Sequence, residues 1–142
     1  MRRDCRTGAY RLDELSAKAV APDSWEELTG RAKPLPLAHE SRPFTVVASR
    51  SHMSGKTEEF IGELGGEHPD LELISAGSLL KLCLVVEGSA DTYPRFARTM
   101  EWDTAAGHAV CTAAGAEVVE WPGETGLRYN EEALKNPWFL VR

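Results

Sequence analysis

The run Phe44-Thr45-Val46-Val47-Ala48-Ser49 decides the fold class. It is almost continuously apolar and rich in β-branched residues, as expected for a strand that is covered on both faces. Ser54 follows at the position of a helix N-cap, so we expect a helix over residues 55–64 that the Gly65-Gly66 pair ends. A buried strand that leads directly into a helix favours an α/β fold.

Strand and helix patterns keep alternating downstream of this run. A helix is expected over residues 79–87, opened by Gly77-Ser78 and ended by Gly88, and another over 104–114, capped by Asp103 and ended by Gly115. Further strands are expected over residues 71–74, 90–96, 116–121 and 127–129, the last after a turn at 122–126. The alternation predicts a mixed sheet with helices on its faces.

The first 42 residues follow a different pattern. Residues 8–12 are strand-like, whereas prolines and few periodic apolar positions mark residues 21–43 as a surface connection, with one helical turn at about 24–28. The predicted organisation is therefore an N-terminal strand with a Pro-containing connection over 1–42, followed by an α/β domain over 43–142.

Composition narrows the class of protein. The 142 residues suit one domain, and 16 basic against 22 acidic side chains give a net charge of −6, which argues against a nucleic-acid polymer as partner. No apolar run approaches the roughly 18 residues that cross a bilayer, and no apolar core of a secretory signal follows Met1-Arg2-Arg3.

Cysteine and histidine placement indicates no metal cluster. Cys5, Cys83 and Cys111 form an odd set without CxxC spacing, so we expect small core thiols in a reducing compartment, by default the cytoplasm. The histidines His39, His68 and His108 have no partner pattern and are expected on the surface or on a helix face.

Polar residues precede three of the expected helices: Ser51-His52-Met53-Ser54, Gly77-Ser78 and Trp102-Asp103-Thr104. Helix N-termini offer free N–H groups and the positive end of a dipole, which suits phosphate. Three such ends on neighbouring elements could meet at one polyanion. The alternative is that Ser54, Ser78 and Asp103 are ordinary caps.

Two cationic side chains strengthen the phosphate interpretation. Lys81 stands in an otherwise apolar helix, where its ammonium must either reach the surface or find an anion. Arg95 lies within an expected strand beside Pro94, where its planar fork could grip a phosphate. The alternatives are a snorkelling surface lysine and an edge-strand arginine paired with a glutamate.

Several blocks taken together resemble a known family. They are Gly77-Ser78-Leu79-Leu80-Lys81-Leu82-Cys83-Leu84-Val85, Gly88-Ser89-Ala90-Asp91-Thr92-Tyr93-Pro94-Arg95-Phe96 and Glu101-Trp102-Asp103-Thr104-Ala105-Ala106-Gly107-His108-Ala109-Val110, with Ser49-Arg50-Ser51-His52 upstream and Asn136-Pro137-Trp138-Phe139 downstream. From about Gly8 onward the chain resembles the C-terminal half of the 3'(2'),5'-bisphosphate nucleotidases of CysQ type. These belong to the lithium-sensitive, magnesium-dependent phosphatases that include inositol monophosphatase.

The resemblance implies a site. It implies a sugar-phosphatase fold in which residues 43–142 bind a nucleotide and its phosphates. It also implies that the family's reaction, the hydrolysis of 3'-phosphoadenosine 5'-phosphate to AMP and phosphate, takes place at this site. That reaction is linked to sulfate assimilation. Asp103 resembles a ligand of catalytic Mg²⁺ that also contacts substrate, and the Thr104 end of its helix would face the scissile phosphate. The positions that match those holding the nucleotide and its non-reacting phosphate are His52, Ser78, Lys81 and Arg95.

The chain departs from the family pattern in its acidic residues. The family's Glu-Glu pair and its Asp-Pro-(apolar)-Asp-Gly-Thr motif have no counterpart here, and one aspartate cannot position the metal ions that phosphoryl transfer requires. We therefore expect a truncated nucleotidase that is inactive alone. The alternatives are a module that binds a bisphosphate nucleotide without hydrolysing it, and a fragment that completes a separate N-terminal half or associates with itself.

Overall fold

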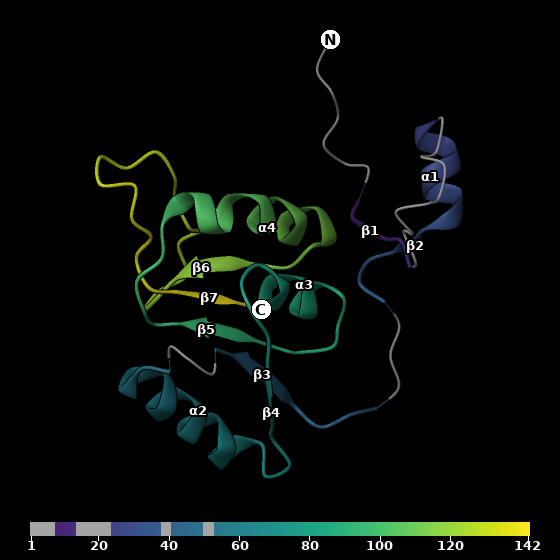
Figure 1. Cartoon of the computed structure of the whole chain (residues 1–142). Coiled ribbons are helices and arrows are strands. Elements are labelled where there is room, and N and C mark those ends of the chain that lie inside the picture. Colours follow the sequence, from purple (N-terminus) through teal and green to yellow (C-terminus); the bar gives the residue numbers. More distant parts are fainter. Residues whose placement is uncertain (1–7, 14–23, 38–40, 50–52) are drawn as a thin grey trace.

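A mixed β-sheet forms the centre of the computed structural model, which describes residues 8–13, 24–37, 41–49 and 53–142 (Figure 1). A parallel bridge between Val46 and Thr92 joins its two parts and gives the strand order β4-β3-β5-β7-β6. One part is parallel, with β3 (Thr45–Ala48) beside β4 (Glu72–Ser75); the other is antiparallel, with β7 (Phe139–Val141) between β5 (Tyr93–Arg95) and β6 (Val118–Glu120). The predicted α/β fold with a mixed sheet is confirmed.

Helices cover both faces of this sheet (Figure 1). Val118 packs in a cluster with residues of α3 (Leu80–Val86) and α4 (Glu101–Ala114), whereas its neighbour Val119 packs with Phe60 of α2 (Gly55–Glu67). Successive strand residues point to opposite faces. The sheet is therefore buried between α3 and α4 on one side and α2 on the other.

The helix boundaries partly follow the sequence prediction. Ser54 caps α2 as expected, since its Oγ accepts a hydrogen bond from Thr57 N at 3.2 Å. Gly115, with a φ of 85°, ends α4 as expected. The prediction that Gly65-Gly66 ends α2 is wrong: the helix continues to Glu67 and ends where His68 N donates to Leu64 O at 2.8 Å.

The predicted cap at Asp103 and the alternative of a cap at Ser78 are also wrong. The first turn of α4 begins at Glu101, so Asp103 is its third residue, and the carboxylate accepts Met100 N at 3.0 Å instead of preceding the helix. Ser78 has a φ of 48°, and Leu79 stands at the N-cap of α3 without a side-chain hydrogen bond. Ser78 thus makes the turn into α3, and its hydroxyl does not cap the helix.

The strand over residues 139–141 was not predicted, although it is the middle strand of the antiparallel part. The expected strand over 127–129 is reduced to a bridge between Val119 and Gly126, with Leu127 N donating to Val118 O at 2.9 Å. All three residues of β7 are buried, which makes it the centre of this half of the sheet.

The N-terminal part contains β1 (Tyr10–Arg11), which pairs antiparallel with β2 (Lys33–Pro34). The predicted turn at 24–28 is a longer helix, α1 (Trp25–Arg31), which Ser24 caps. Arg42 then fastens the connection to the sheet through bonds to Asp91 Oδ2 at 2.5 Å and to Gly88 O at 2.8 Å. The boundary at residue 42 remains a prediction.

Cys111 is fully buried and Cys83 half-buried, both as free thiols, in agreement with the expected core role. Cys5 lies outside the described residues. Within the described ranges, no helix has the length and apolar character that a membrane crossing requires.

Candidate functional site

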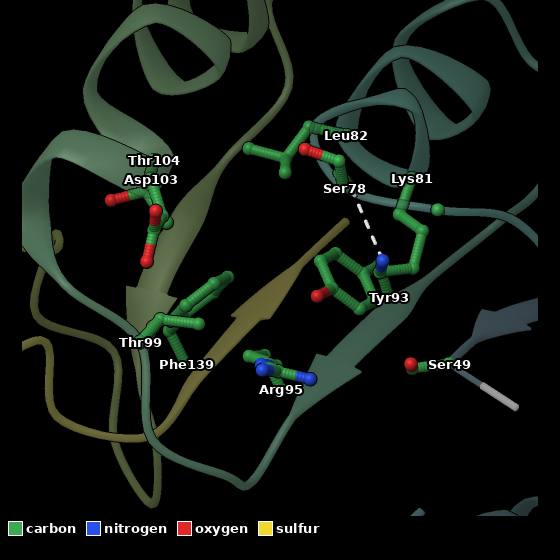
Figure 2. Close-up of a pocket in the computed structure, with 11 residues that line it drawn as sticks. Ser49, Ser78, Lys81, Leu82, Tyr93, Arg95, Thr99, Asp103, Thr104 and Phe139 are labelled. Carbon is green, nitrogen blue, oxygen red and sulfur yellow. Dashed lines mark hydrogen bonds between the residues drawn. The ribbon is translucent and has the colours of Figure 1, made fainter. Parts of the chain in front are cut away.

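A cavity of about 350 Å³ lies between the sheet and the N-terminal ends of α3 and α4 (Figure 2). Tyr93 and Arg95 share one face of β5, and Arg95 is in register with Phe139 on β7, so these three side chains form the floor. The remaining lining residues are Ser49, Gly77, Ser78, Lys81, Leu82, Thr99, Asp103 and Thr104.

Five of the six predicted site residues therefore meet in one cavity. They are Ser78, Lys81, Arg95, Asp103 and Thr104. The sixth, His52, lies outside the described residues.

Lys81 is buried, with 4% of its surface exposed. Its Nζ donates to Ala76 O at 3.2 Å and to Ser78 O at 3.1 Å, and it lies 5.3 Å from the centre of the Tyr93 ring. Burial, and secondarily the positive charge of Arg95, lower the pKa of Lys81. The alternative of a snorkelling surface lysine is wrong, and two carbonyl acceptors leave one ammonium hydrogen for a ligand.

Arg95 is not an edge-strand residue, because β5 pairs with β7 on one side and bridges to β3 on the other. One guanidinium nitrogen, Nη2, donates to Arg98 O at 3.2 Å. Within the described ranges its Nε is buried without a hydrogen-bond partner. The expected alternative of an ion pair with a glutamate is not found among those residues.

Asp103 is exposed at the mouth of the cavity and is the one acidic residue of the described chain that lines it. No group of three or more His, Cys, Asp or Glu side chains able to hold a metal ion occurs in the part of the chain that the structure describes. Mg²⁺ prefers six oxygen ligands in octahedral geometry. The described residues can supply one of them, and they do not by themselves fit a magnesium site.

Thr104 has a fully used hydroxyl group. Its Oγ1 donates to Glu101 O at 3.1 Å and accepts from Asn136 Nδ2 at 3.0 Å and from Tyr129 Oη at 3.3 Å. The Tyr129 hydroxyl group also forms a hydrogen bond of 3.0 Å with Nδ1 of His108. His108 is half-buried on one face of α4, in agreement with the expected helix-face position, and joins this network through Tyr129.

Two further residues hold the first turn of α4 in place. The buried Glu101 carboxylate accepts Asn130 N at 2.7 Å and Glu131 N at 2.9 Å. The buried Asn136 Nδ2 also donates to Met100 O at 2.8 Å. We call Glu101, Thr104 and Asn136 the α4 latch, because together they tie the segment before β7 to the helix turn that carries Asp103.

No individual role was predicted from the sequence for Glu101 and Asn136 of the α4 latch or for the aromatic residues Tyr93 and Phe139 of the floor. Glu101 resembles any acid in a first helical turn, and Tyr93 and Phe139 resemble core aromatics. One usable signal for Tyr93 was its position two residues before Arg95, which places both on one face of a strand.

The fold and the cavity define a layered α/β protein with a cationic, partly aromatic binding site. The chain belongs to the inositol monophosphatase family, whose sequence model matches residues 18–139. It is 46% identical over 123 residues to the 3'(2'),5'-bisphosphate nucleotidase CysQ of Salmonella typhimurium, an alignment that covers 87% of this chain and 48% of that protein. The expected resemblance is confirmed.

Comparison with solved structures supports the same family and fold. CysQ from Bacteroides thetaiotaomicron, a bacterial member of the inositol monophosphatase family, superposes with a TM-score of 0.83 at 49% identity, over 96% of this chain and 50% of that one. The 2'AMP-bound inositol monophosphatase II of Staphylococcus aureus has a TM-score of 0.56 at 19% identity, over 77% of this chain and 40% of that one, and supports the fold alone. The chain spans about half the length of the curated relatives it matches.

Proposed function

We propose that the cavity binds a 3'(2'),5'-bisphosphate nucleotide such as 3'-phosphoadenosine 5'-phosphate. The observation that carries this proposal is the proximity of Lys81 and Arg95, two cations in one cavity, where the charge of Arg95 contributes to the lowered pKa of Lys81. Holding like charges together away from water costs free energy, and a bound anion offsets that cost. The similarity to CysQ nucleotidases supports the same substrate class.

The proposed roles combine the family resemblance with the residues that line the cavity, and the role of His52, outside the described residues, rests on the resemblance alone. Lys81 and Arg95 grip the phosphate that is not cleaved, which in a reaction that yields AMP is the 5'-phosphate. The backbone N–H groups at the start of α4, around Thr104, face the scissile phosphate. Asp103 contacts the substrate and offers one carboxylate to Mg²⁺, while Ser78 and His52 orient the nucleotide.

Magnesium, where it is bound, would generate the attacking hydroxide and neutralise the leaving oxygen. Because the described residues provide one carboxylate in the cavity, we infer that this chain by itself does not hydrolyse its ligand. The missing ligands would come from an N-terminal half, in the same longer protein or in another chain. We place the protein in the cytoplasm, where its thiols stay reduced.

Calorimetry with the purified chain tests the binding proposal. We expect heat on titration with 3'-phosphoadenosine 5'-phosphate, and a weaker signal with adenosine 3'-monophosphate, which lacks the phosphate assigned to Lys81 and Arg95. Lys81→Met should weaken binding, whereas Lys56→Met, on the exposed side of α2, should leave it unchanged. Absence of any binding by the wild-type chain would overturn the proposal.

A phosphate-release assay tests the inferred inactivity. We expect no Mg²⁺-dependent release of phosphate from this nucleotide. Turnover that Asp103→Asn abolishes would show that the chain is a complete catalyst.

A second candidate function is that of a fragment that completes a separate half. It is favoured by the coverage of about half of each relative and by exposed apolar side chains, Leu80 at 63%, Trp102 at 66% and Leu73 at 48%. Mixing the chain with a polypeptide that carries the Glu-Glu and Asp-Pro-(apolar)-Asp-Gly-Thr motifs should then restore phosphate release. A monomer by sedimentation that gains no activity from such a partner would exclude this function.

A further inference from the structure

Tyr93 lines the cavity, and the sequence resemblance gives it no role of its own. Its side chain is 4% exposed, and the ring is held between Lys81 Nζ, 5.3 Å from its centre, and the Phe139 ring, at 5.9 Å and nearly perpendicular. These contacts use the ring alone. Packing therefore fixes the position of Tyr93 without any contribution from its hydroxyl group.

The hydroxyl group of Tyr93 points into the cavity, toward the space between Arg95 and Asp103 (Figure 2). No hydrogen bond joins it to another residue in the ranges that the structure describes. The oxygen is open to the cavity, so a ligand atom that enters can replace water as its hydrogen-bond partner. The orientation indicates a ligand atom as that partner.

Two cationic residues line the same cavity. Arg95 lies two residues beyond Tyr93 on the same face of β5, and its Nε is buried without a partner in the described chain. Lys81 retains one ammonium hydrogen beyond its two carbonyl acceptors. Burial raises the pKa of Tyr93 to about 12, against a smaller opposing effect of Arg95, so the hydroxyl keeps its hydrogen at neutral pH.

We infer that Tyr93 is a specificity-determining residue whose O–H donates to an oxygen of the phosphate held by Lys81 and Arg95. The inference rests on the proposed function, because it names a further group at the same site. A hydroxyl adds a directed hydrogen bond without adding charge. It therefore favours an anion whose oxygen stands at a fixed position, as in a phosphate ester.

Tyr93→Phe isolates the hydroxyl, because it keeps the ring and its contacts. We expect about a tenfold loss of affinity for 3'-phosphoadenosine 5'-phosphate and for AMP, which both carry the 5'-phosphate. Affinity for adenosine 3'-monophosphate should not change. Tyr10→Phe, on the half-exposed β1, is the matched control and should bind like the wild type. An unchanged melting temperature for Tyr93→Phe would show that the difference lies in recognition.

The outcomes separate this inference from the proposed function. Equal affinity of wild type and Tyr93→Phe for the bisphosphate nucleotide would overturn the role of Tyr93 and leave the proposed function standing. If the wild-type chain binds none of the nucleotides, the proposed function fails, and inorganic phosphate becomes the probe in an NMR titration. Phosphate binding that Tyr93→Phe weakens would then support the role of Tyr93, and binding that is equal or absent would overturn it.

Discussion

Gly107 of α4 lies so close to Leu82 of α3 that a β-carbon at Gly107 would stand 2.9 Å from Leu82 Cδ2. The same β-carbon would also overlap Leu79 Cδ1. A glycine at this point lets the two helices approach each other. Because Lys81 lies in the first turn of α3 and Asp103 in the first turn of α4, this contact fixes the spacing of the two helix starts that line the cavity.

Gly107→Ala should destabilise the protein. Overpacking typically lowers the free energy of unfolding by about 1–3 kcal/mol, and the better helix propensity of alanine offsets up to about 1 kcal/mol of this loss. We therefore expect a lower urea midpoint and weaker nucleotide binding, since the start of α3 must shift. Gly62→Ala in α2 is the control, because no atom lies within 4 Å of its β-carbon, and it should be neutral or stabilising. Equal stability of the two variants would contradict this account of the helix contact.

Glu101→Gln should loosen the α4 latch. The carboxylate accepts two backbone N–H groups, and an amide presents one acceptor and an N–H donor in its place. Loss of charge-assisted bonds of this kind costs about 1–3 kcal/mol. Hydrogen exchange at the amides of Asn130 and Glu131 should accelerate more than elsewhere. Glu132→Gln, at an exposed position of the same segment, should exchange like the wild type.

Asp91→Asn should weaken the attachment of the N-terminal connection. Asp91 accepts two guanidinium nitrogens of Arg42, at 2.5 and 3.1 Å, and also the backbone N of Thr45, at 2.6 Å. Removing one partner of a half-buried charged pair costs about 1–3 kcal/mol. Thermal unfolding measures the loss, with Asp70→Asn, in the exposed turn before β4, as the control. An unchanged melting temperature would show that Arg42 is held by Gly88 and Pro43 alone.

Stability should fall as the pH rises above about 9. Burial raises the pKa of Cys111 from 9.0 to about 12, with a smaller effect of Cys83, so between these values the folded state keeps a proton that the unfolded state releases. The pKa of Tyr93, raised from 10.0 to about 12, also lowers the stability of the folded state as the pH rises. The pKa of Lys81 is lowered from 10.5, and this shift has the opposite effect on stability. Comparison with Cys111→Ala isolates the thiol: the slope of unfolding free energy against pH should be shallower in that variant. Parallel slopes would contradict the shifted pKa of Cys111.

The sequence was sufficient to predict those elements that depend on contacts between residues adjacent in the chain. The β-branched run at β3 and the Ser54 cap were predicted because strand burial and capping depend on adjacent residues. The Gly65-Gly66 pair misled because glycine permits a helix end without requiring one. The start of α4 was placed too late because Met100 is not a typical capping residue.

The residue types of the site could be predicted from the sequence, whereas most of the contacts that hold these residues could not. Polar residues at three helix starts and the lone cations Lys81 and Arg95 indicated an anion site. The structure brings the two cations and the starts of α3 and α4 into one cavity, whereas Ser54 at the start of α2 does not line it. The burial of Lys81 under two carbonyl groups, and the use of Glu101 and Asn136 as a latch, depend on contacts between distant segments. Such contacts leave no periodic signal in one sequence.

The position of β7 bears on how the protein is synthesised. It follows β5 and β6 along the chain and yet lies between them, so those two strands emerge from the ribosome before the strand that joins them. Until then, the edges of β5 and β6 that face β7 lack their native partner, although β5 can already bridge to β3 and β6 can already pair with the segment around Gly126. Native pairing in this half of the sheet therefore has to wait until residues 139–141 have been made.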